Sequence, residues 1–319
     1  MVICLTLYCK LSYLIVRGVN ILKTLKPFVK WAGGKGQLLA DIRKKYPKNI
    51  DRYCEPFVGG GAVLFDVLKN YFPKEIYISD VNAELINTYI TIRDNAEDLM
   101  TKLLEIQNAY IPLELDERKK FYYNIRAKFN DLKVNGNKTV NLEKATLFMF
   151  LNRTCFNGLF RVNSKGLFNV PMGSYKNPVI CDKENIKNVS EKLQSVKIVC
   201  GDYRESLKFI DNNTFVYLDP PYRPITETAS FTAYSENIFD DKCQRELAEF
   251  TKIATSAGAL VVISNSDPKN SDENDNFFDE LYENFTIDRV SAKRMINCIG
   301  EKRSKISELL ISNYEVIAI

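Results

Sequence analysis

Residues 215–223 read Phe-Val-Tyr-Leu-Asp-Pro-Pro-Tyr-Arg, a short apolar run that stops at two prolines. The first four residues predict a buried strand. The prolines end it, because proline has no N–H for sheet pairing and its φ is fixed. Asp219 is therefore expected at the carboxyl end of a strand, where open α/β sheets bind their ligands.

The turn Asp219-Pro220-Pro221-Tyr222 offers a carboxylate, a backbone carbonyl and a flat aromatic ring. The exocyclic amino group of a base such as adenine is a poor nucleophile, because its lone pair is delocalised into the ring. The Asp219 carboxylate and the Pro220 carbonyl can accept its two N–H groups and favour a pyramidal nitrogen, while Tyr222 stacks on the base. An ordinary turn after a strand is the alternative for these four residues alone.

Composition narrows the class of protein. The 319 residues suffice for one large domain or two modest ones, and 45% apolar with 26% charged residues is typical of a soluble globular protein. A net charge of +4 permits a nucleic-acid partner without requiring one. The chain has no histidine, which excludes Ser-His-Asp and Cys-His catalysis and histidine zinc sites.

The eight cysteines include no Cys-x-x-Cys pair, which argues against a zinc ribbon and a disulfide framework. Reduced thiols in a cytoplasmic protein are the simplest expectation, and we expect no metal. The apolar run 2–16 carries Lys10 and is too short to span a bilayer comfortably. We interpret residues 1–24 as an extra N-terminal segment without a role in the chemistry, and we expect no membrane partner.

Residues 26–35, Lys-Pro-Phe-Val-Lys-Trp-Ala-Gly-Gly-Lys, precede a helical pattern at 37–45. A phosphate-binding loop would need glycine where Val29 stands and a hydroxyl residue where Gly36 stands, so that interpretation fails. A glycine turn with one large aromatic residue and two lysines remains. Such a turn suits a loop that covers an anionic or carboxylate-bearing ligand. A solvated loop without a ligand is the alternative.

A predicted strand at 52–57 leads through Val58-Gly-Gly-Gly61 into a predicted helix at 62–70. Such a loop lets the backbone approach a ligand at a helix N-terminus. A second strand, 76–79, ends at Asp80, which suits an acidic residue that binds ribose hydroxyls. Leu64 occupies the third glycine position of the dinucleotide fingerprint, so a nucleoside without a pyrophosphate fits better. A structural glycine turn is the alternative.

Residues 96–133 show a charged helical pattern that should bury its aromatic residues rather than form a binding face. Residues 152–171 differ, because they are dense in Asn, Arg, Lys and aromatic residues, with a hairpin turn at 164–166. Arg pairs with guanine and Asn with adenine, so this composition suits a hairpin that reads bases. A polar surface hairpin is the alternative. Further strands are predicted at 196–200, 259–264 and 309–312, with a helix at about 240–257.

Four motifs now stand in order, at residues 30–35, 55–61, 157–171 and 219–222. They read Lys-Trp-Ala-Gly-Gly-Lys, Glu-Pro-Phe-Val-Gly-Gly-Gly, Asn-Gly-Leu-Phe-Arg-x-Asn-x-x-Gly-x-Phe-Asn-Val-Pro and Asp-Pro-Pro-Tyr. Together they closely resemble the Dam family of N6-adenine DNA methyltransferases (D12 class), which methylates GATC and includes enzymes of restriction–modification systems. The resemblance runs from about Leu25 to Tyr314 and includes Phe-Thr-Ala-Tyr at 231–234.

The resemblance implies a role for each matching residue. Asp219, Pro220, Pro221 and Tyr222 would form the catalytic turn. The cofactor S-adenosyl-L-methionine would be bound by Trp31, Lys35, Phe57, Gly59, Gly61, Asp80 and Asp202, with Asp219 beside it. Double-stranded DNA would be contacted by Lys30, Phe156, Asn157, Leu159 and Arg161, and its phosphates by Lys302 and Arg303. Phe156 stands where some members carry tyrosine, so stacking is expected there without a hydroxyl contact.

The implied fold is a Rossmann-like S-adenosyl-L-methionine-dependent methyltransferase sheet with an inserted, mainly helical DNA-recognition domain. The expected segments are 1–24, the catalytic parts 25–94 and 191–319, and the recognition insert 95–190. The target adenine would be flipped out of the duplex. The sulfonium of the cofactor is already an activated methyl donor, so the chemistry needs neither metal nor histidine. A monomer is expected, with a dimer as the alternative.

Other functions remain to be weighed. An amino methyltransferase acting on cytosine N4 would be expected to carry serine at position 219. An RNA or protein methyltransferase can use a similar turn, but it has no use for the Asn-Gly-Leu-x-Arg sequence at 157–161. A DNA-binding protein without activity should have lost Asp219 or the glycine loop, and the chain keeps both.

Overall fold

The computed structural model describes residues 24–136, 140–223, 239–293 and 305–316. The predicted N-terminal segment therefore lies outside the described residues, except for Thr24. The predicted phosphate contacts Lys302 and Arg303 and the family motif at 231–234 also lie outside them.

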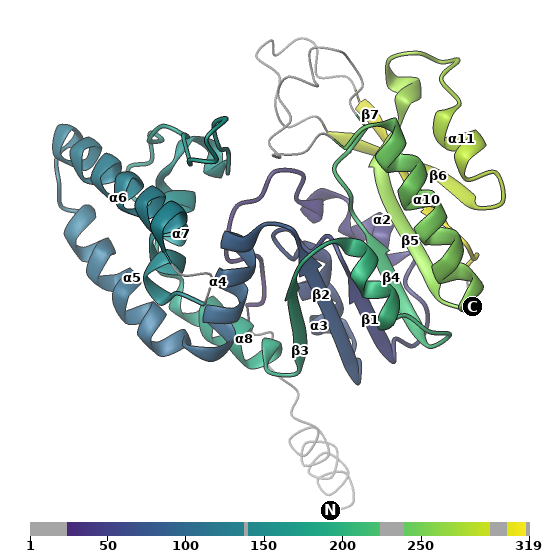
Figure 1. The fold of residues 1–319 in the computed structure, drawn as a ribbon, viewed down its shortest axis with the longest axis horizontal. Helices are drawn as coiled ribbons and strands as arrows, with labels where there is room; N and C mark the ends of the chain where they lie inside the picture. The colour runs from purple at the N-terminus through teal and green to yellow at the C-terminus, as the bar shows by residue number, and fades with distance from the viewer. Residues whose placement is uncertain (1–23, 137–139, 224–238, 294–304, 317–319) are drawn as a thin grey trace, which may run out of the picture.

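The described residues form a seven-stranded sheet with the order β3-β2-β1-β4-β5-β7-β6 (Figure 1). Strands β1 to β5 pair in parallel, and β7 runs antiparallel to both β5 and β6. The strands are β1 (Arg52–Glu55), β2 (Glu75–Asp80), β3 (Val196–Cys200), β4 (Thr214–Leu218), β5 (Leu260–Ser266), β6 (Thr286–Lys293) and β7 (Lys305–Ser312).

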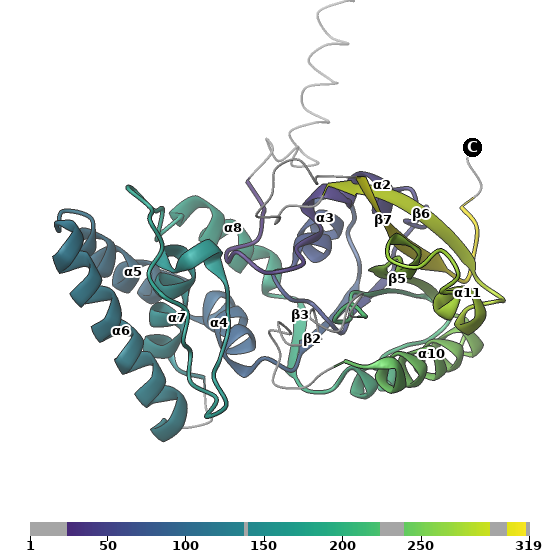
Figure 2. The ribbon, with the colours of Figure 1, turned by 90° about the horizontal axis from the view of Figure 1, so that it is seen from above.

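Helices lie on both faces of this sheet and beside it (Figures 1 and 2). The α-helices are α2 (Leu39–Arg43), α3 (Ala62–Asn70), α4 (Ala83–Asp94), α5 (Ala96–Tyr110), α6 (Leu115–Asn135), α7 (Leu142–Thr154), α8 (Lys183–Leu193), α10 (Asp241–Ser256) and α11 (Phe277–Leu281). The short 3₁₀ helices are η1 (Lys35–Gln37), η2 (Phe156–Gly158), η3 (Tyr203–Lys208) and η4 (Pro268–Asn270). Of the described helices, none is both long and apolar enough to cross a membrane.

Strand β4 shows why the sheet needs cover on both faces. All five of its residues are buried, and successive side chains point to opposite faces. Phe215 and Tyr217 join the core under α2 and α3, whereas Val216 and Leu218 join a second core under α10 and α11. This strand therefore sits near the middle of the sheet, and Asp219 emerges at its carboxyl end as predicted.

The other predicted strands and the helix α10 are also present, and helix α3 begins and ends where the sequence predicts. Sequence analysis missed β6. Its sequence, Thr-Ile-Asp-Arg-Val-Ser-Ala-Lys, mixes charged and apolar residues, because β6 is the last strand of the sheet and pairs only with β7. An edge strand with one paired side needs fewer apolar residues than β4.

Helices α5, α6 and α7 pack together at one side of the sheet (Figure 1). The charged pattern at 96–133 is two helices rather than one, and it buries Tyr122 and Phe129 as expected. Phe129 packs against Phe148 of α7, in a core that continues to the sheet. The predicted segment boundaries at 95 and 190 stay a prediction, since one core passes from the sheet into these helices.

Candidate active site

Asp219 is the first residue after β4, and two donors hold the same oxygen of its carboxylate. Oδ1 accepts a hydrogen bond from Ser264 Oγ at 2.9 Å and pairs with Lys35 Nζ at 2.7 Å. Ser264 lies on the neighbouring strand β5 and in turn accepts a hydrogen bond from Tyr217 at 3.1 Å. Among the described residues, Oδ2 of Asp219 has no hydrogen-bond or ion-pair partner.

Lys35 brings the glycine turn at 33–36 to the catalytic turn. Its side chain is only 6% exposed, and Nζ also donates to the Gly33 carbonyl at 2.7 Å. The same ammonium lies 4.6 Å from the centroid of the Tyr222 ring. The resemblance implied a cofactor contact for Lys35, and the structure adds a direct ion pair with Asp219.

Tyr222 presents its ring to this cluster, while its hydroxyl points elsewhere. The hydroxyl donates to Glu308 Oε2 on β7 at 2.6 Å. Burial raises the pKa of Tyr222 well above its ordinary value, and Asp219 and Glu308 add to the shift. Tyr222 is therefore a neutral hydrogen-bond donor at physiological pH, and its ring is the part left for a base to stack on.

A cavity of about 380 Å³ opens beside Asp219. Its lining includes five of the residues predicted to bind the cofactor or catalyse the reaction, namely Trp31, Lys35, Gly59, Gly61 and Asp219. Phe57, Asp80 and Asp202 do not line it. The geometry thus brings these five together and leaves those three, as well as Pro220, Pro221 and Tyr222, outside the lining of the cavity.

The glycine loop at 59–61 is one that only glycine tolerates. Gly59 and Gly61 have φ values of 47° and 76°, in the left-handed region. A Cβ on Gly59 would lie 2.9 Å from Trp31 Cδ1, and one on Gly61 would lie 2.4 Å from the Tyr89 hydroxyl. The loop therefore packs directly against Trp31, and its close approach to a ligand stays a prediction.

Both carboxylate oxygens of Asp80 accept hydrogen bonds from backbone N–H groups. Oδ2 accepts from the Gly59 N–H at 3.0 Å, and Oδ1 accepts from the Asn82 N–H at 2.9 Å. Burial raises the pKa of Asp80, although these hydrogen bonds counteract the shift. Asp80 therefore fixes the glycine loop, and the ribose contact that the resemblance implies stays a prediction.

Asp202 follows β3 and lies at the same edge of the sheet, since β2 and β3 pair Asp80 with Cys200. Its carboxylate accepts two hydrogen bonds from the Arg204 guanidinium, at 2.8 and 2.9 Å, and one from the Arg204 backbone N–H at 2.9 Å, and Arg204 lowers the pKa of Asp202. Phe57 stacks on Tyr203, with ring centroids 5.1 Å apart. Both predicted residues thus have protein partners, and their cofactor roles stay predictions.

Glu55 is a residue of this site to which the sequence analysis gave no role. It is 2% exposed, lines the cavity with Lys35 and Asp219, and accepts a hydrogen bond from Tyr53 at 2.7 Å. Burial raises the pKa of Glu55 well above its ordinary value. The sequence held one signal for such a role. Glu55 stands in a predicted strand directly before Pro56, and a carboxylate at the end of a buried strand is unusual.

The stretch predicted as a base-reading hairpin begins later than expected. Residues 152–154 belong to the end of α7, so the prediction that Asn152 and Arg153 lie in the hairpin is wrong. Asn152 is buried and bonds the Lys30 N–H at 2.8 Å, the Lys30 carbonyl at 2.8 Å and the Gly158 carbonyl at 2.9 Å. This amide therefore joins Lys30 to the base of the hairpin.

The turn at 164–166 is present, and Val162 pairs with Phe168 across it. Phe156, Asn157 and Arg161 are exposed there, with Asn157 in the left-handed region at φ 53°. Arg161 Nε donates to Asn169 Oδ1 at 2.8 Å. Leu159 differs from them, because it is half-buried and packs against the core.

The consecutive residues Lys30 and Trp31 both pack against this hairpin. Lys30 Nζ lies 3.9 Å from the centroid of the Tyr175 ring, and a Cβ on Gly158 would come within 2.5 Å of the Lys30 side chain. The Trp31 ring stacks on Phe160 at 5.9 Å. The structure thus brings the predicted DNA contacts Lys30, Phe156, Asn157 and Arg161 into one region.

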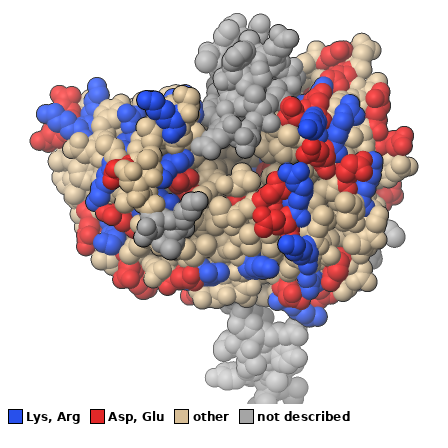
Figure 3. All heavy atoms as spheres, in the orientation of Figure 1, with Lys and Arg blue, Asp and Glu red and all other residues tan. Residues whose placement is uncertain are grey.

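Charges on the visible face are mixed in sign (Figure 3). Lys and Arg alternate with Asp and Glu over the helices of both parts of the molecule, and a mostly uncharged area lies between them. On this face, the distribution of charged side chains therefore does not mark a DNA-binding surface. Within the described ranges, no three His, Cys, Asp or Glu side chains gather in a way that could hold a metal ion.

Comparison with known proteins decides the class of enzyme. Residues 31–296 match the model of the D12 class N6 adenine-specific DNA methyltransferases. The chain belongs to this family. The match covers most of the chain, including the cavity, the hairpin and the catalytic turn, so the resemblance identified from the four motifs is confirmed.

Three relatives cover nearly the whole chain. The type II methyltransferase M.MjaIII of Methanocaldococcus jannaschii is 47% identical over 296 residues, which are 91% of this chain and 99% of that protein. The type II methyltransferase M1.LlaDCHI of Lactococcus lactis subsp. cremoris is 39% identical, over 91% and 96% of the two chains. The DNA adenine methylase of Escherichia coli (strain K12) is 34% identical, over 91% and 95%.

The chain is therefore an adenine-specific DNA methyltransferase that acts on N6. Its mixed α/β sheet is the fold class that the sequence predicts. This family assignment excludes the alternatives of a cytosine N4 methyltransferase and an RNA methyltransferase. The roles of single residues stay predictions.

Proposed function

We propose that this D12-class enzyme transfers the methyl group of S-adenosyl-L-methionine to N6 of the adenine in GATC, in duplex DNA. The observation that carries the proposal is the state of the catalytic turn. Oδ1 of Asp219 is held by Ser264 and Lys35, so Oδ2 remains as an acceptor beside the cavity.

The residues around the cavity fit the cofactor. Gly59 and Gly61 allow close backbone approach, Asp80 fixes that loop, and Trp31 forms one wall. Trp31, Lys35, Phe57, Gly59, Gly61, Asp80 and Asp202 would hold it. When bound, it supplies an activated methyl group on a sulfonium.

The chain's own contribution is positioning and electrostatic complementarity. Asp219 Oδ2 and the Pro220 carbonyl would accept the two N–H groups of the adenine amine, which frees its lone pair. Asp219 Oδ2 would also accept the proton that leaves N6 once the methyl group has passed to it from the sulfonium. Tyr222, whose hydroxyl is held by Glu308, would stack on the flipped base.

The hairpin would read the sequence. Arg161 and Asn157 are exposed residue types that bond base edges bidentately, and Lys30 is fixed beside them. Phe156 is 52% exposed and aromatic, which suits stacking on an unpaired or flanking base. Lys302 and Arg303 would contact phosphates, which position the duplex without reading it.

Two names among the relatives bear on the biological setting. M.MjaIII and M1.LlaDCHI are called type II methyltransferases, a restriction–modification term. We therefore propose that this enzyme also protects host DNA from a cognate nuclease.

The test is transfer of labelled methyl from S-adenosyl-L-methionine to duplexes that contain GATC or one of its single-base variants, followed by nucleoside analysis. We expect N6-methyladenine in the GATC duplex only. Equal labelling of all duplexes would remove the GATC assignment, and no labelling of any would remove the donor assignment as well.

A further inference from the structure

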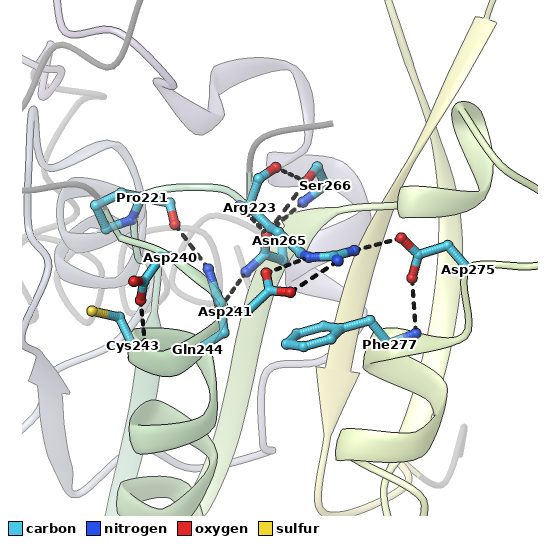
Figure 4. A network of polar contacts seen from close by, with 10 residues as sticks. All are labelled: Pro221, Arg223, Asp240, Asp241, Cys243, Gln244, Asn265, Ser266, Asp275 and Phe277. Carbon is cyan, nitrogen blue, oxygen red and sulfur yellow. Dashed lines mark hydrogen bonds and ion pairs between the residues drawn. The ribbon is translucent and has the colours of Figure 1, made fainter. Parts of the chain in front are cut away.

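Two buried amide side chains, those of Gln244 and Asn265, hydrogen-bond the backbone of the catalytic turn (Figure 4). Gln244, in the first turn of α10, has no exposed surface, and its Nε2 donates to the Pro221 carbonyl at 3.1 Å. Its Oε1 accepts from Asn265 Nδ2 at 3.1 Å. The Gln244 amide is thus engaged at both ends, which fixes its orientation.

Asn265, at the end of β5, continues this chain of hydrogen bonds. Its Oδ1 accepts from the Arg223 N–H at 3.2 Å and from the Ser266 N–H at 2.9 Å. Ser266 Oγ donates to the Arg223 carbonyl at 3.0 Å. The backbone of the turn is therefore held at Pro221 and again at Arg223.

The side chain of Arg223 ties the turn to the same end of α10. It bonds Asp241 through two nitrogens at 2.6 and 3.1 Å and Asp275 at 2.6 Å, and it lies 4.3 Å from the Phe277 ring centroid. Asp241 and Gln244 are three residues apart and so share one helix face. One helical turn therefore holds both ends of the segment 221–223.

The carbonyl of Pro220, directly before the first of these anchors, has no such restraint of its own. None of the described residues donates a hydrogen bond to the Pro220 carbonyl. Asp219 Oδ2 is a second acceptor in the turn without a described partner. Their relative position depends on the backbone at 220–221, and the hydrogen bond from Gln244 restrains that backbone.

We propose that Gln244 is a positioning residue for methyl transfer, which holds the Pro221 peptide so that the Pro220 carbonyl faces the amino group of the target base. The role rests on the proposed function of the turn. Gln244 itself would touch neither DNA nor cofactor, since its amide is used by Pro221 and Asn265. The Pro221 carbonyl lies one peptide beyond the Pro220 carbonyl, so a shift of the backbone at Pro221 would move the acceptor out of line with the N–H group.

Gln244→Met and Gln244→Glu test the proposal as a pair. Methionine keeps the length but has no donor at any pH, so kcat should fall about 10- to 100-fold, a typical cost of misplacement by about 1 Å. KM values for DNA and for S-adenosyl-L-methionine should change little, because the substrate contacts remain.

Gln244→Glu should depend on pH. A protonated glutamic acid can donate to the Pro221 carbonyl and accept from Asn265, as the amide does, whereas the carboxylate can only accept. Burial raises the pKa of a carboxyl group, so protonation should extend into the assay range. The ratio of the variant's kcat to the wild-type kcat should therefore fall as pH rises from about 6 to 9, while the Gln244→Met ratio stays flat and low.

Gln107→Met is the matched control. Its amide also holds a loop, by accepting from the N–H groups of Ile180 and Cys181 at 3.1 Å each, but it lies in α5. It should keep the wild-type kcat. A folded Gln244→Met enzyme with wild-type kcat, or a kcat loss that Gln107→Met reproduces, would overturn the role of Gln244 alone. Failure of the wild type to methylate DNA adenine would overturn the proposed function itself.

Discussion

Replacing Asp219 with alanine should destabilise the protein as well as abolish catalysis, because it leaves a buried ammonium without its anion. The Lys35 side chain is 6% exposed and the Asp219 side chain 20% exposed, with 2.7 Å between Nζ and Oδ1. The Gly33 carbonyl and the Tyr222 ring would remain as described partners of Nζ, and neither carries a negative charge. Removing one partner of a buried pair costs about 3–5 kcal/mol. Since Asp219 is partly exposed, we expect about 3 kcal/mol.

A double-mutant cycle isolates this effect. Lys35→Met in the Asp219→Ala background removes the stranded charge, so the double variant should be more stable than Asp219→Ala alone. Free energies of unfolding from urea titrations give the coupling. Asp51→Ala is the control, because Asp51 and Lys74 form a pair at 3.1 Å whose side chains are 56% and 81% exposed. Surface pairs of this kind contribute about 0–1 kcal/mol.

Methyl transfer should be lost in Asp219→Ala with or without Lys35, because the acceptor for N6 is gone in both. The reasoning fails if Asp219→Ala is no less stable than Asp51→Ala, or if the double variant gains nothing over the single one. Near-wild-type turnover of folded Asp219→Ala would refute the catalytic assignment independently of stability.

Three further predictions concern the loop, the cavity and the hairpin. Asp80→Ala leaves two half-buried N–H groups without this acceptor, at about 1 kcal/mol each, so thermal denaturation should show a lower Tm and calorimetry a weaker cofactor affinity; an unchanged Tm would contradict this. Burial raises the pKa of Glu55 above 4.5, so the folded state loses stability as pH rises from there toward the raised pKa; Glu55→Gln should remove this loss in urea titrations across pH, and parallel pH profiles would argue against it. Arg161→Ala should relax discrimination at one base pair of GATC by about 1–3 kcal/mol, measured as methylation of GATC against its single-base variants, whereas an equal loss on all sites would show that Arg161 reads no base.

The central strands were predictable because burial on both faces demands continuous apolar residues. Strand β4 is the clearest case, since all five of its residues are buried and two prolines follow it. Strand β6 was not predictable on the same grounds. Its charged residues Asp288 and Arg289 have partners on other elements, namely Lys45 and Asp267, and no pattern along the strand announces such partners.

The site was predictable where one motif carries several functional residues, as in the catalytic turn and the glycine loop. It was not predictable where elements distant in sequence meet. Ser264 and Gln244 contact the turn only because β5 lies beside β4 and α10 packs over them. A signal for part of this existed, since the apolar strand β5 ends in Ser-Asn-Ser, and buried polar residues need hydrogen-bond partners.

Residues 30–35 connect the regions predicted for recognition, cofactor binding and catalysis. Lys30 is joined to the hairpin through Asn152, and Lys35 reaches Asp219 in the catalytic turn. Between them, Trp31 packs against Gly59 on one side and stacks on Phe160 of the hairpin on the other. The interior of a protein is densely packed, so a shift of the hairpin cannot leave Trp31 and the glycine loop unmoved. A six-residue segment therefore places the predicted DNA-reading hairpin, the glycine loop and the Asp219 carboxylate in one continuous set of contacts.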